Sequence, residues 1–282
     1  MIDMEMNNWQ KEVDENERFE FGANWVNYIG KLSDERVAAA RTSLNGFLPA
    51  DLLKGASFLD IGSGSGLHSL AAVLDGANVT SFDFDPYSVS ATTTMRDKFN
   101  INPANWTVLQ GSVLDDEFVR RFSQFDIVYS WGVLHHTGNM WKAIENTLSL
   151  TKHQGYCFIA IYNKQGWKSR FWWYIKKIYN KLPKGLKNAY ALLLGGFFQA
   201  LNIVKYTLLL KPHIAINPLL NYKSRRGMSW FNDIIDWMGG FPYEYASVSE
   251  LKDFFKTYGF ELFKLKESTS LGCNELLFKK VG

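Results

Sequence analysis

A glycine-rich turn between a short apolar strand and a helix is the feature that most constrains the fold of this chain. The strand pattern covers Phe58–Ile61, and glycines follow it at alternate positions, Gly62, Gly64 and Gly66. From Leu67 to Leu74 the apolar residues recur at the spacing of one helix face. A strand, a glycine-rich turn and a helix in this order open a βαβ unit, whose next strand lies parallel to the first.

The alternation of strands and helices continues along the chain on both sides of a long interruption. The predicted strands span residues 58–61, 78–82, 106–109, 125–129, 156–162, 261–266 and 274–279, and the predicted helices span 67–74, 88–99, 116–122, 141–150 and 248–258. We also predict a turn at Gln154–Gly155, before the fifth strand. This pattern predicts a Rossmann-like α/β fold with a doubly wound, seven-stranded sheet. The last two strands should form an antiparallel hairpin at one edge, because no helix separates them.

Charge divides the chain into a core and an insertion. From Asn146 to Asn232 there are 14 lysines and arginines and no acidic residue, which leaves 17 basic against 28 acidic residues elsewhere. We therefore expect an N-terminal helical segment at 1–50, a core at 51–163 and 247–282, and a basic, aromatic helical cap insertion at 164–246.

Composition excludes several classes of protein. With 46% hydrophobic and 21% charged residues the chain is globular rather than intrinsically disordered. Two cysteines, Cys157 and Cys273, are too few for a disulfide framework, and no acidic cluster suggests a metal site. The first residues, Met1–Glu5, are acidic where a secretory signal would be basic, so we expect a cytoplasmic protein.

The spacing of the glycines narrows the kind of nucleotide that this turn could bind. A dinucleotide loop requires a glycine five positions after Gly62, where this chain has Leu67. The Gly-Lys-Ser/Thr sequence of a phosphate-binding P-loop is also missing. Instead Asp60 stands two residues before the first glycine, and Asp83 follows the second strand.

The string Asp60-x-Gly62-x-Gly64-x-Gly66, with an acid at the end of the next strand, resembles class I S-adenosylmethionine-dependent methyltransferases. The segment from Tyr129 to His136, Tyr-Ser-Trp-Gly-Val-Leu-His-His, is similar to the fourth-strand motif of the small-molecule branch that includes ubiquinone-biosynthesis enzymes. The resemblance covers about Phe58–Asn163 and Ser247–Lys279. It implies S-adenosylmethionine as the cofactor.

The resemblance also implies a role for individual residues of the cofactor site. For the amino-acid part, Asp60 would lie near the methionine amine, Gly62 and Gly64 would bind through their backbone, and Ser130 would accept the amine with its carbonyl. For the ribose, Asp83 would accept hydrogen bonds from both hydroxyls. For the adenine, Phe84 would pack beside the ring, and Ser112 and Val113 would lie at its edge. Ser112 departs from the family, which often has an acid there. The alternative is that the glycines only form a tight turn and that Asp83 caps a helix.

Methyl transfer requires an acceptor aligned with the sulfonium methyl group, and a hydroxyl acceptor also benefits from a base. His135 and His136 follow the fourth strand, and we favour His135 as the base over a purely structural role for the pair. Tyr162 is the next catalytic candidate. The candidate substrate-binding residues are Trp131, Asn163, Arg226 and Tyr243, and Trp25 could close over the cofactor.

The insertion allows three interpretations, which we rank as a helical lid or homodimer face, a membrane-surface contact through 167–211, and nucleic-acid binding, which we do not expect. Gly166–Lys181 is predicted as an amphipathic helix, with Lys176 on its polar side and Phe171 and Ile178 on its apolar side. The apolar run between Lys187 and Lys205 is predicted to be too short and too polar to span a bilayer. In the membrane interpretation, a loop around Phe197 and Phe198 would enter the headgroup region of an anionic bilayer.

Taken together, these patterns predict metal-independent methyl transfer from S-adenosylmethionine to a hydroxyl oxygen of a small, amphiphilic or lipid-linked acceptor. Nitrogen methylation is the close alternative. The other alternative is a non-catalytic S-adenosylmethionine-binding protein that uses the insertion as an interaction surface. The chain contains neither an Asn/Asp-Pro-Pro-Tyr string nor a Pro-Cys motif, which disfavours methylation of DNA bases.

Overall fold

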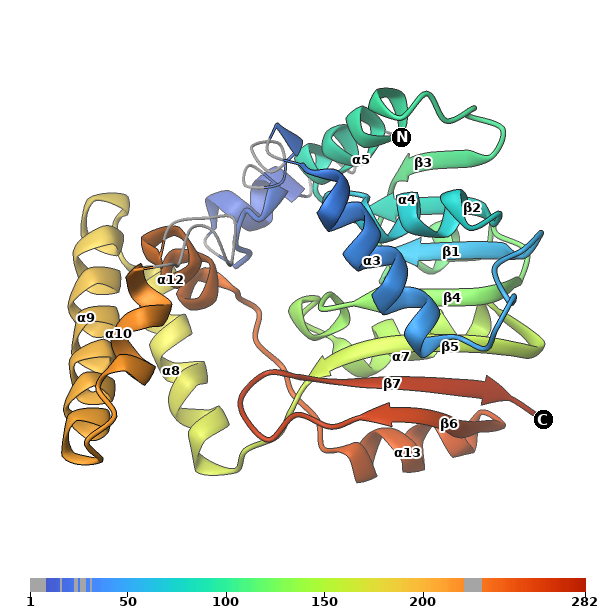
Figure 1. The fold of residues 1–282 in the computed structure, drawn as a ribbon. Coiled ribbons are helices and arrows are strands. Elements are labelled where there is room, and N and C mark those ends of the chain that lie inside the picture. Colours follow the sequence, from blue (N-terminus) through green and yellow to red (C-terminus); the bar gives the residue numbers. More distant parts are fainter. Residues whose placement is uncertain (1–8, 16, 23–24, 26–28, 31, 221–229) are drawn as a thin grey trace.

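A computed structural model describes the chain from residue 9 to residue 282, except residues 16, 23–24, 26–28, 31 and 221–229. Seven strands form one sheet in the order β3-β2-β1-β4-β5-β7-β6 (Figure 1). The strands are β1 (Ser57–Ile61), β2 (Asn78–Asp83), β3 (Trp106–Gln110), β4 (Phe125–Trp131), β5 (Thr151–Tyr162), β6 (Phe260–Lys266) and β7 (Cys273–Lys280). Strands β1 to β5 pair in parallel, and β7 pairs antiparallel with both β5 and β6. The predicted sheet and its terminal hairpin are confirmed.

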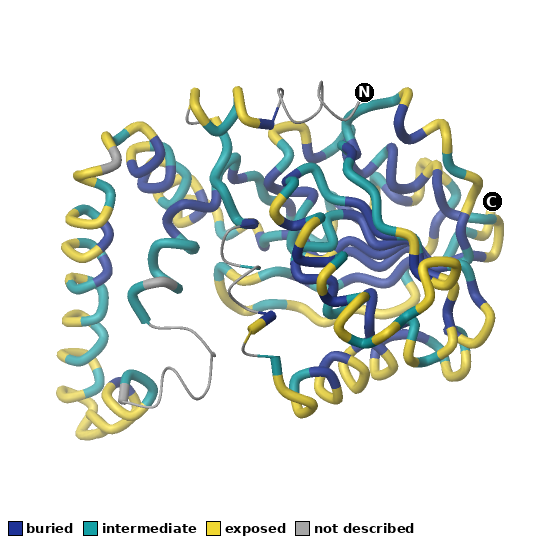
Figure 2. The backbone as a smooth tube through the Cα atoms, turned by 90° about the horizontal axis from the view of Figure 1, so that it is seen from above, coloured by how far each residue is buried: buried dark blue, intermediate teal, exposed yellow. Residues whose placement is uncertain are grey.

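Helices cover both faces of this sheet. One face is packed by α3 (Asp34–Phe47), α4 (Leu67–Leu74) and α5 (Pro86–Lys98), and the other by α6 (Asp116–Val119), α7 (Met140–Ser149) and α13 (Val248–Thr257). A short 3-10 helix, η1 (Leu134–His136), follows β4. The strands in the middle of the sheet are buried from both sides, as Figure 2 shows. This two-sided burial explains why the strands read as almost continuous apolar runs rather than as alternating ones.

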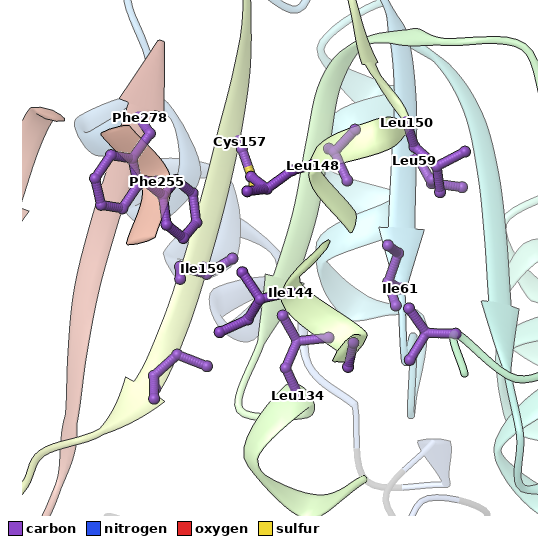
Figure 3. Close-up of a cluster of buried hydrophobic side chains, with 14 of the residues drawn as sticks. Leu59, Ile61, Leu134, Ile144, Leu148, Leu150, Cys157, Ile159, Phe255 and Phe278 are labelled. Carbon is purple, nitrogen blue, oxygen red and sulfur yellow. The ribbon is translucent and has the colours of Figure 1, made fainter. Parts of the chain in front are cut away.

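The face covered by α7 and α13 contains the larger of the two cores. Side chains from β1, β4, β5 and β7 meet those of the two helices there, and Leu59, Ile144 and Ile159 are among those drawn in Figure 3. Phe255 of α13 stacks on Phe278 of β7 with ring centroids 3.7 Å apart. Helix α13 begins with a capping box, a local sequence signal in which Ser247 and Glu250 each bind the other's backbone N–H.

The turn predicted at Gln154–Gly155 is wrong. Strand β5 runs through both residues, and Gln154 takes a left-handed backbone conformation with φ 63° inside the strand. The pairing with β4 shifts its register nearby, between Phe125 and Ile127. A Cβ at Gly155 would lie 2.9 Å from the carbonyl oxygen of Asp126, so this position requires glycine for close packing. Glycine is typical of turns, but Gly155 lies where the strand pairing is irregular.

The insertion forms a helical lobe, which we define as α8 (Trp167–Lys181), α9 (Lys184–Leu208), α10 (His213–Leu220) and α12 (Trp230–Gly239). In Figure 1 the lobe stands beside the sheet, and the carboxyl ends of the parallel strands point toward it. Its small core contains Tyr179, Ala191 and Met238. Gly195 lets α9 approach α12 closely, since a Cβ there would lie 2.5 Å from Ile234.

The orientation of α8 differs from the predicted one. Lys176, predicted on the polar side, is fully buried, whereas Phe171 and Ile178 of the predicted apolar side are 44% and 49% exposed. The amphipathic pattern of the sequence placed Lys176 on the solvent-exposed side because lysine is charged. In the structure the surface that α8 buries also includes Ser169 and Asn180, because it faces the site as well as the small core of the lobe.

Helix α9 is longer than its apolar run suggested. Residues Gly185–Leu208 form a continuous helical segment of 24 residues, whose most apolar 18 residues have a mean hydropathy of 1.3 and are only 11% buried. By length and composition alone it could cross a bilayer, so the prediction that it is too short and too polar was wrong. The helix is longer than the apolar run because it continues beyond Lys187 and Lys205, the lysines at the two ends of that run.

Candidate functional site

The candidate site lies where the loops after β1, β2 and β4 meet. The backbone N–H groups of Gly62 and Ser63 donate to the carbonyl oxygen of Phe82 at 2.8 and 3.2 Å, which ties the glycine loop to β2. Gly62 has φ 77°, and a Cβ there would lie 2.4 Å from the side chain of Val133 in the loop after β4. Glycine therefore allows three strand ends to converge at one edge of the sheet.

Asp83 holds the centre of this edge. Its carboxylate accepts the N–H of Gly64 at 2.9 Å and the N–H of Asp85 at 3.0 Å. Asp85, rather than Asp83, caps helix α5 by accepting the N–H of Tyr87 at 2.9 Å. The alternative in which Asp83 is only a helix cap is therefore not what the structure shows.

Two carboxylates lie together at this edge, the buried one of Asp60 and the half-buried one of Asp83. Asp60 accepts the hydroxyl of Ser69 at 2.5 Å, and burial raises its pKa to about 7, with the neighbouring Asp83 adding to the shift. Burial also raises the pKa of Asp83 to about 6. Within the described residues, neither carboxylate forms an ion pair with a lysine or arginine. The charge of Arg18 lowers the pKa of Asp83, but it forms no ion pair with either carboxylate. Negative charge with so little compensation suits a ligand that brings its own positive charge, as the amine and sulfonium of S-adenosylmethionine would.

Aromatic and small residues surround the two carboxylates. Phe84 follows Asp83, and the guanidinium of Arg18 lies 4.9 Å from the centre of its ring. The indole of Trp25 lies against the glycine loop, 3.1 Å from where a Cβ of Gly64 would stand. Arg18 was not predicted as a site residue, because the sequence around it contains no recognisable motif.

Three further predicted cofactor residues have contacts of their own. Ser130 is buried, and its hydroxyl donates to the carbonyl of Ile61 at 2.9 Å, which joins β4 to β1 next to the glycine loop. Val113 is buried, and its carbonyl accepts the amide of Asn146 at 2.8 Å. The hydroxyl of Ser112 accepts the N–H of Leu114 at 3.2 Å. The contact with the cofactor that the resemblance implies for each of these three residues stays a prediction.

His136 is held by the segment that follows the lobe. Its Nδ1 lies 2.6 Å from the carbonyl oxygen of Pro242, and because a carbonyl can only accept, Nδ1 carries the proton. Nε2 is then an acceptor, and no described residue forms a hydrogen bond with it. Burial and the charge of Lys176 lower the pKa of His136 to about 3, so the imidazole is neutral near pH 7.

His135 faces the sheet instead. Its Nδ1 accepts the backbone N–H of Tyr162 at 3.4 Å, and a hydrogen bond to the backbone of Ala160 also engages the ring. The residue is 1% exposed, and burial lowers its pKa well below the ordinary value. These contacts with β5 favour a structural role for His135.

An aromatic cluster joins the histidines to the lobe. The ring of Tyr162 lies 4.0 Å from His135 and 5.4 Å from His136, and the ring of Tyr243 lies 5.1 Å from Tyr162. The ammonium of Lys176 lies 5.0 Å from the centre of the Tyr243 ring. Sequence reasoning missed Lys176, because nothing in an amphipathic pattern marks a lysine as buried.

The remaining predicted substrate residues are dispersed. The amide of Asn163 donates to the carbonyl of Ser268 at 2.7 Å and its oxygen accepts from Asn274 at 3.2 Å, so the side chain holds the turn between β6 and β7. Trp131 is 46% exposed at the end of β4. Arg226 lies outside the described residues.

Two hollows on the described surface lie away from this site. One, of about 550 Å³, is lined by residues that include Arg41, Asn45 and Lys54, and the other, of about 470 Å³, by residues that include Trp141 and Phe254. Neither contains a predicted site residue. Among the described residues, no group of three or more histidine, cysteine, aspartate or glutamate side chains is arranged to hold a metal ion.

A solved structure shares the fold. The magnesium protoporphyrin IX methyltransferase of Synechocystis PCC 6803, solved with bound S-adenosylhomocysteine, superposes with a TM-score of 0.50 over 88% of this chain and 81% of that one. The two sequences are 14% identical, so this likeness concerns the fold alone.

Two relatives by sequence are ubiquinone biosynthesis O-methyltransferases. The enzyme of Erwinia tasmaniensis is 28% identical over 182 residues, which cover 61% of this chain and 70% of the relative. The enzyme of Coxiella burnetii is 28% identical over 135 residues, 47% of this chain, and the match spans only about half, 55%, of its length.

The methyltransferase domain family matches residues 33–202, which is more than half of the chain. The match includes the glycine loop, Asp83, the histidine pair, α8 and the greater part of α9. It supports S-adenosylmethionine as the cofactor, as the sequence predicted. The chain, with its seven-stranded sheet and its two carboxylates beside the glycine loop, therefore belongs to the methyltransferase domain family.

Proposed function

We propose that this protein transfers a methyl group from S-adenosylmethionine to a hydroxyl oxygen of a small or amphiphilic acceptor. The observation that carries the proposal is the position of His136 and Tyr162, which follow the same edge of the sheet as the glycine loop and Asp83. The bound cofactor would supply an electrophilic methyl group on a sulfonium. The residues of the chain would align the acceptor and exclude water, which together provide much of the rate of such a displacement.

The base that assists a hydroxyl acceptor is assigned to His136 in this proposal, in place of the His135 that we favoured from the sequence. His136 has an acceptor nitrogen without a described partner, whereas both contacts of His135 are with β5. Because Nδ1–H donates to Pro242, the ring is fixed in the tautomer that leaves Nε2 ready to accept a proton.

The acceptor atom is tested by incubating the protein with S-adenosylmethionine labelled in its methyl group and a panel of hydroxylated and amine compounds. Mass spectrometry of the products then distinguishes oxygen methylation from nitrogen methylation. We expect oxygen-methylated products. Products methylated only at nitrogen would establish the first alternative, and tight cofactor binding without any product would favour a non-catalytic binding protein.

Cofactor affinity should also depend on pH. Asp60, with a pKa of about 7, must be ionised to meet the positive charge of the cofactor's amine. Asp83, with a pKa of about 6, must be ionised to accept both ribose hydroxyls. As pH falls through these values, each carboxylate gains a proton, so the affinity for S-adenosylmethionine should decrease from pH 8 to pH 5 by up to about tenfold per pH unit for each proton taken up. Calorimetry across this range checks the prediction, and a flat profile would contradict it.

We further propose that the protein is cytoplasmic and contacts a membrane surface through α9. Seven apolar residues of this helix are each at least half exposed, and all of them except Leu192 lie within about 80° of arc on a helix that turns about 100° per residue. The residues within this arc are Leu186, Leu193, Phe197, Leu201, Val204 and Leu208, which we call the apolar stripe. The opposite face of α9 packs on the lobe, for example through the ring of Phe198, 5.1 Å from Trp172. A helix with one packed face and one apolar face suits the plane of a bilayer better than its interior.

Charge favours an anionic bilayer as the partner of this stripe. Lys187 and Lys205 follow Leu186 and Val204, so both lie along the same edge of the stripe. No acidic residue occurs between Asn146 and Asn232. Each lysine near an anionic surface contributes about 1 kcal/mol to binding, while its apolar stem remains in the boundary. Such a contact would give the site access to a lipid-linked or amphiphilic acceptor.

Binding to vesicles tests the membrane contact. The wild-type protein should cosediment with anionic vesicles at low salt, less at high salt, and little with neutral vesicles. Phe197→Asp should weaken this binding about tenfold or more, because it removes a ring that the bilayer would bury and adds a negative charge that the anionic surface would repel. The matched control is Asn188→Asp, which adds the same charge on another face of α9 and should weaken binding less.

A different pair of outcomes would contradict the membrane contact. If the wild-type protein shows no preference for anionic vesicles, the stripe does not recognise a bilayer. If Phe197→Asp instead converts a dimer to a monomer in the absence of lipid, the stripe is a homodimer face.

A further inference from the structure

Lys176 is a buried lysine in the middle of the helical lobe. It lies on α8, is fully buried, and is among the largest fully buried side chains of the described chain. Burial of an ammonium costs several kcal/mol unless another charge compensates for it. Consistent with this cost, burial alone lowers the pKa of Lys176 to about 7. A group that is so costly to bury calls for a charge partner.

The described part of the protein does not provide that partner. One N–H of the ammonium donates to the backbone carbonyl of Trp237, and the other two have no described hydrogen-bond acceptor. The rings of Trp237 and Tyr243 lie 4.5 and 5.0 Å from the nitrogen, and attract it only as aromatic faces. No described carboxylate forms an ion pair with it, and none contributes to its pKa.

The ammonium lies between the small core of the lobe, to which Trp237 belongs, and the histidine pair. Its charge lowers the pKa of both His135 and His136, which places it near the two imidazoles. The Tyr243 ring beneath it is 5.1 Å from Tyr162, and Tyr162 in turn contacts the histidine pair. Lys176 is therefore connected to the histidine pair through the rings of Tyr243 and Tyr162.

We propose that Lys176 binds an anionic oxygen of the methyl acceptor, so that the acceptor carries a carboxylate or an acidic hydroxyl. The two N–H groups without a described partner would donate to this oxygen, and its charge would compensate the buried ammonium. The rings of Tyr162, Tyr243 and Trp237 beside the ammonium would contact the apolar body of the acceptor. This inference rests on the proposed methyltransferase function and specifies the acceptor class of that same site.

Binding of small aromatic anions tests the inference without knowledge of the natural acceptor. The protein, saturated with S-adenosylhomocysteine, is titrated calorimetrically with benzoate and with dinitrophenolate, and in parallel with the neutral analogues benzamide and dinitroanisole. At least one anion should bind about tenfold or more tightly than its neutral analogue, as expected for hydrogen bonds to a charged group. Benzoate and dinitrophenolate separate a carboxylate from an ionised hydroxyl as the recognised group.

Two lysine variants assign the preference to one residue. Lys176→Met should abolish the preference for anions and leave the affinity for S-adenosylhomocysteine unchanged. Lys177→Met, the control, removes the next lysine of the same helix, whose ammonium lies 4.4 Å from the ring of Trp173, and should keep the preference. Absence of anion binding in the wild-type protein, or a preference that survives in Lys176→Met, would overturn the inference. If the wild-type protein does not bind S-adenosylhomocysteine at all, the proposed function itself fails, which is a distinct result.

Discussion

Replacing His136 by alanine should slow methyl transfer to a hydroxyl acceptor by about 10²-fold while leaving the affinity for S-adenosylmethionine unchanged. A positioned base contributes about 10²–10⁴ to the rate, and the effect is largest when its pKa lies near the working pH. Because burial holds the pKa of His136 at about 3, we expect the lower end of that range. Transfer of a labelled methyl group to the best hydroxylated compound of the acceptor panel measures the rate, and calorimetry measures the affinity.

His135→Ala is the matched control for this prediction. Its ring is engaged by the backbone of β5, so the variant should lose thermal stability but keep its rate per folded molecule. If His135→Ala loses the rate and His136→Ala retains it, the assignment from the contacts is wrong and the order favoured from the sequence is right. If both variants retain the rate, neither histidine is the base.

Replacing Asp83 by alanine should weaken the binding of S-adenosylmethionine about 10- to 150-fold. Hydrogen bonds to a charged group contribute about 1.5–3 kcal/mol, and the substitution removes the carboxylate that would accept the ribose hydroxyls. The variant also removes the acceptor for the N–H of Gly64, which orders the glycine loop. Calorimetric titration with S-adenosylmethionine measures the change.

Asp126→Ala separates cofactor binding from general stability. Asp126 lies on β4 away from the site, where it accepts the N–H of Ser57 at 2.9 Å and forms an ion pair with Lys152. Its removal should lower the melting temperature and leave the cofactor affinity unchanged. Equal losses of affinity in the Asp83 and Asp126 variants would mean that Asp83 acts only through stability.

The core of the fold could be predicted because its sequence signals are local. Glycines at Gly62 and Gly64, followed by an apolar helix face, require a strand, a turn and a helix almost regardless of context. The capping box at Ser247 likewise needs only a span of four residues. The edge that carries the cofactor residues then follows, because parallel strands bring their carboxyl ends together.

The site on the acceptor side depends on packing between distant segments, which a single sequence does not reveal. Asn163 was predicted to bind substrate, but its side chain forms hydrogen bonds with Ser268 and Asn274, more than 100 positions further along the chain. Whether His135 or His136 keeps an acceptor nitrogen depends on Pro242 and on the backbone of β5. Lys176 contacts Trp237 of α12 and Tyr243 of the segment after it, and both lie about 60 positions or more further along the chain.

The central claim, that this chain is an S-adenosylmethionine-dependent methyltransferase, is tested most directly by calorimetric titration of the wild-type protein with S-adenosylmethionine and, separately, with NAD. We expect saturable binding of S-adenosylmethionine at one site per chain, and no binding of NAD, because Leu67 stands where a dinucleotide loop has its third glycine. Binding of NAD with no binding of S-adenosylmethionine would contradict the claim.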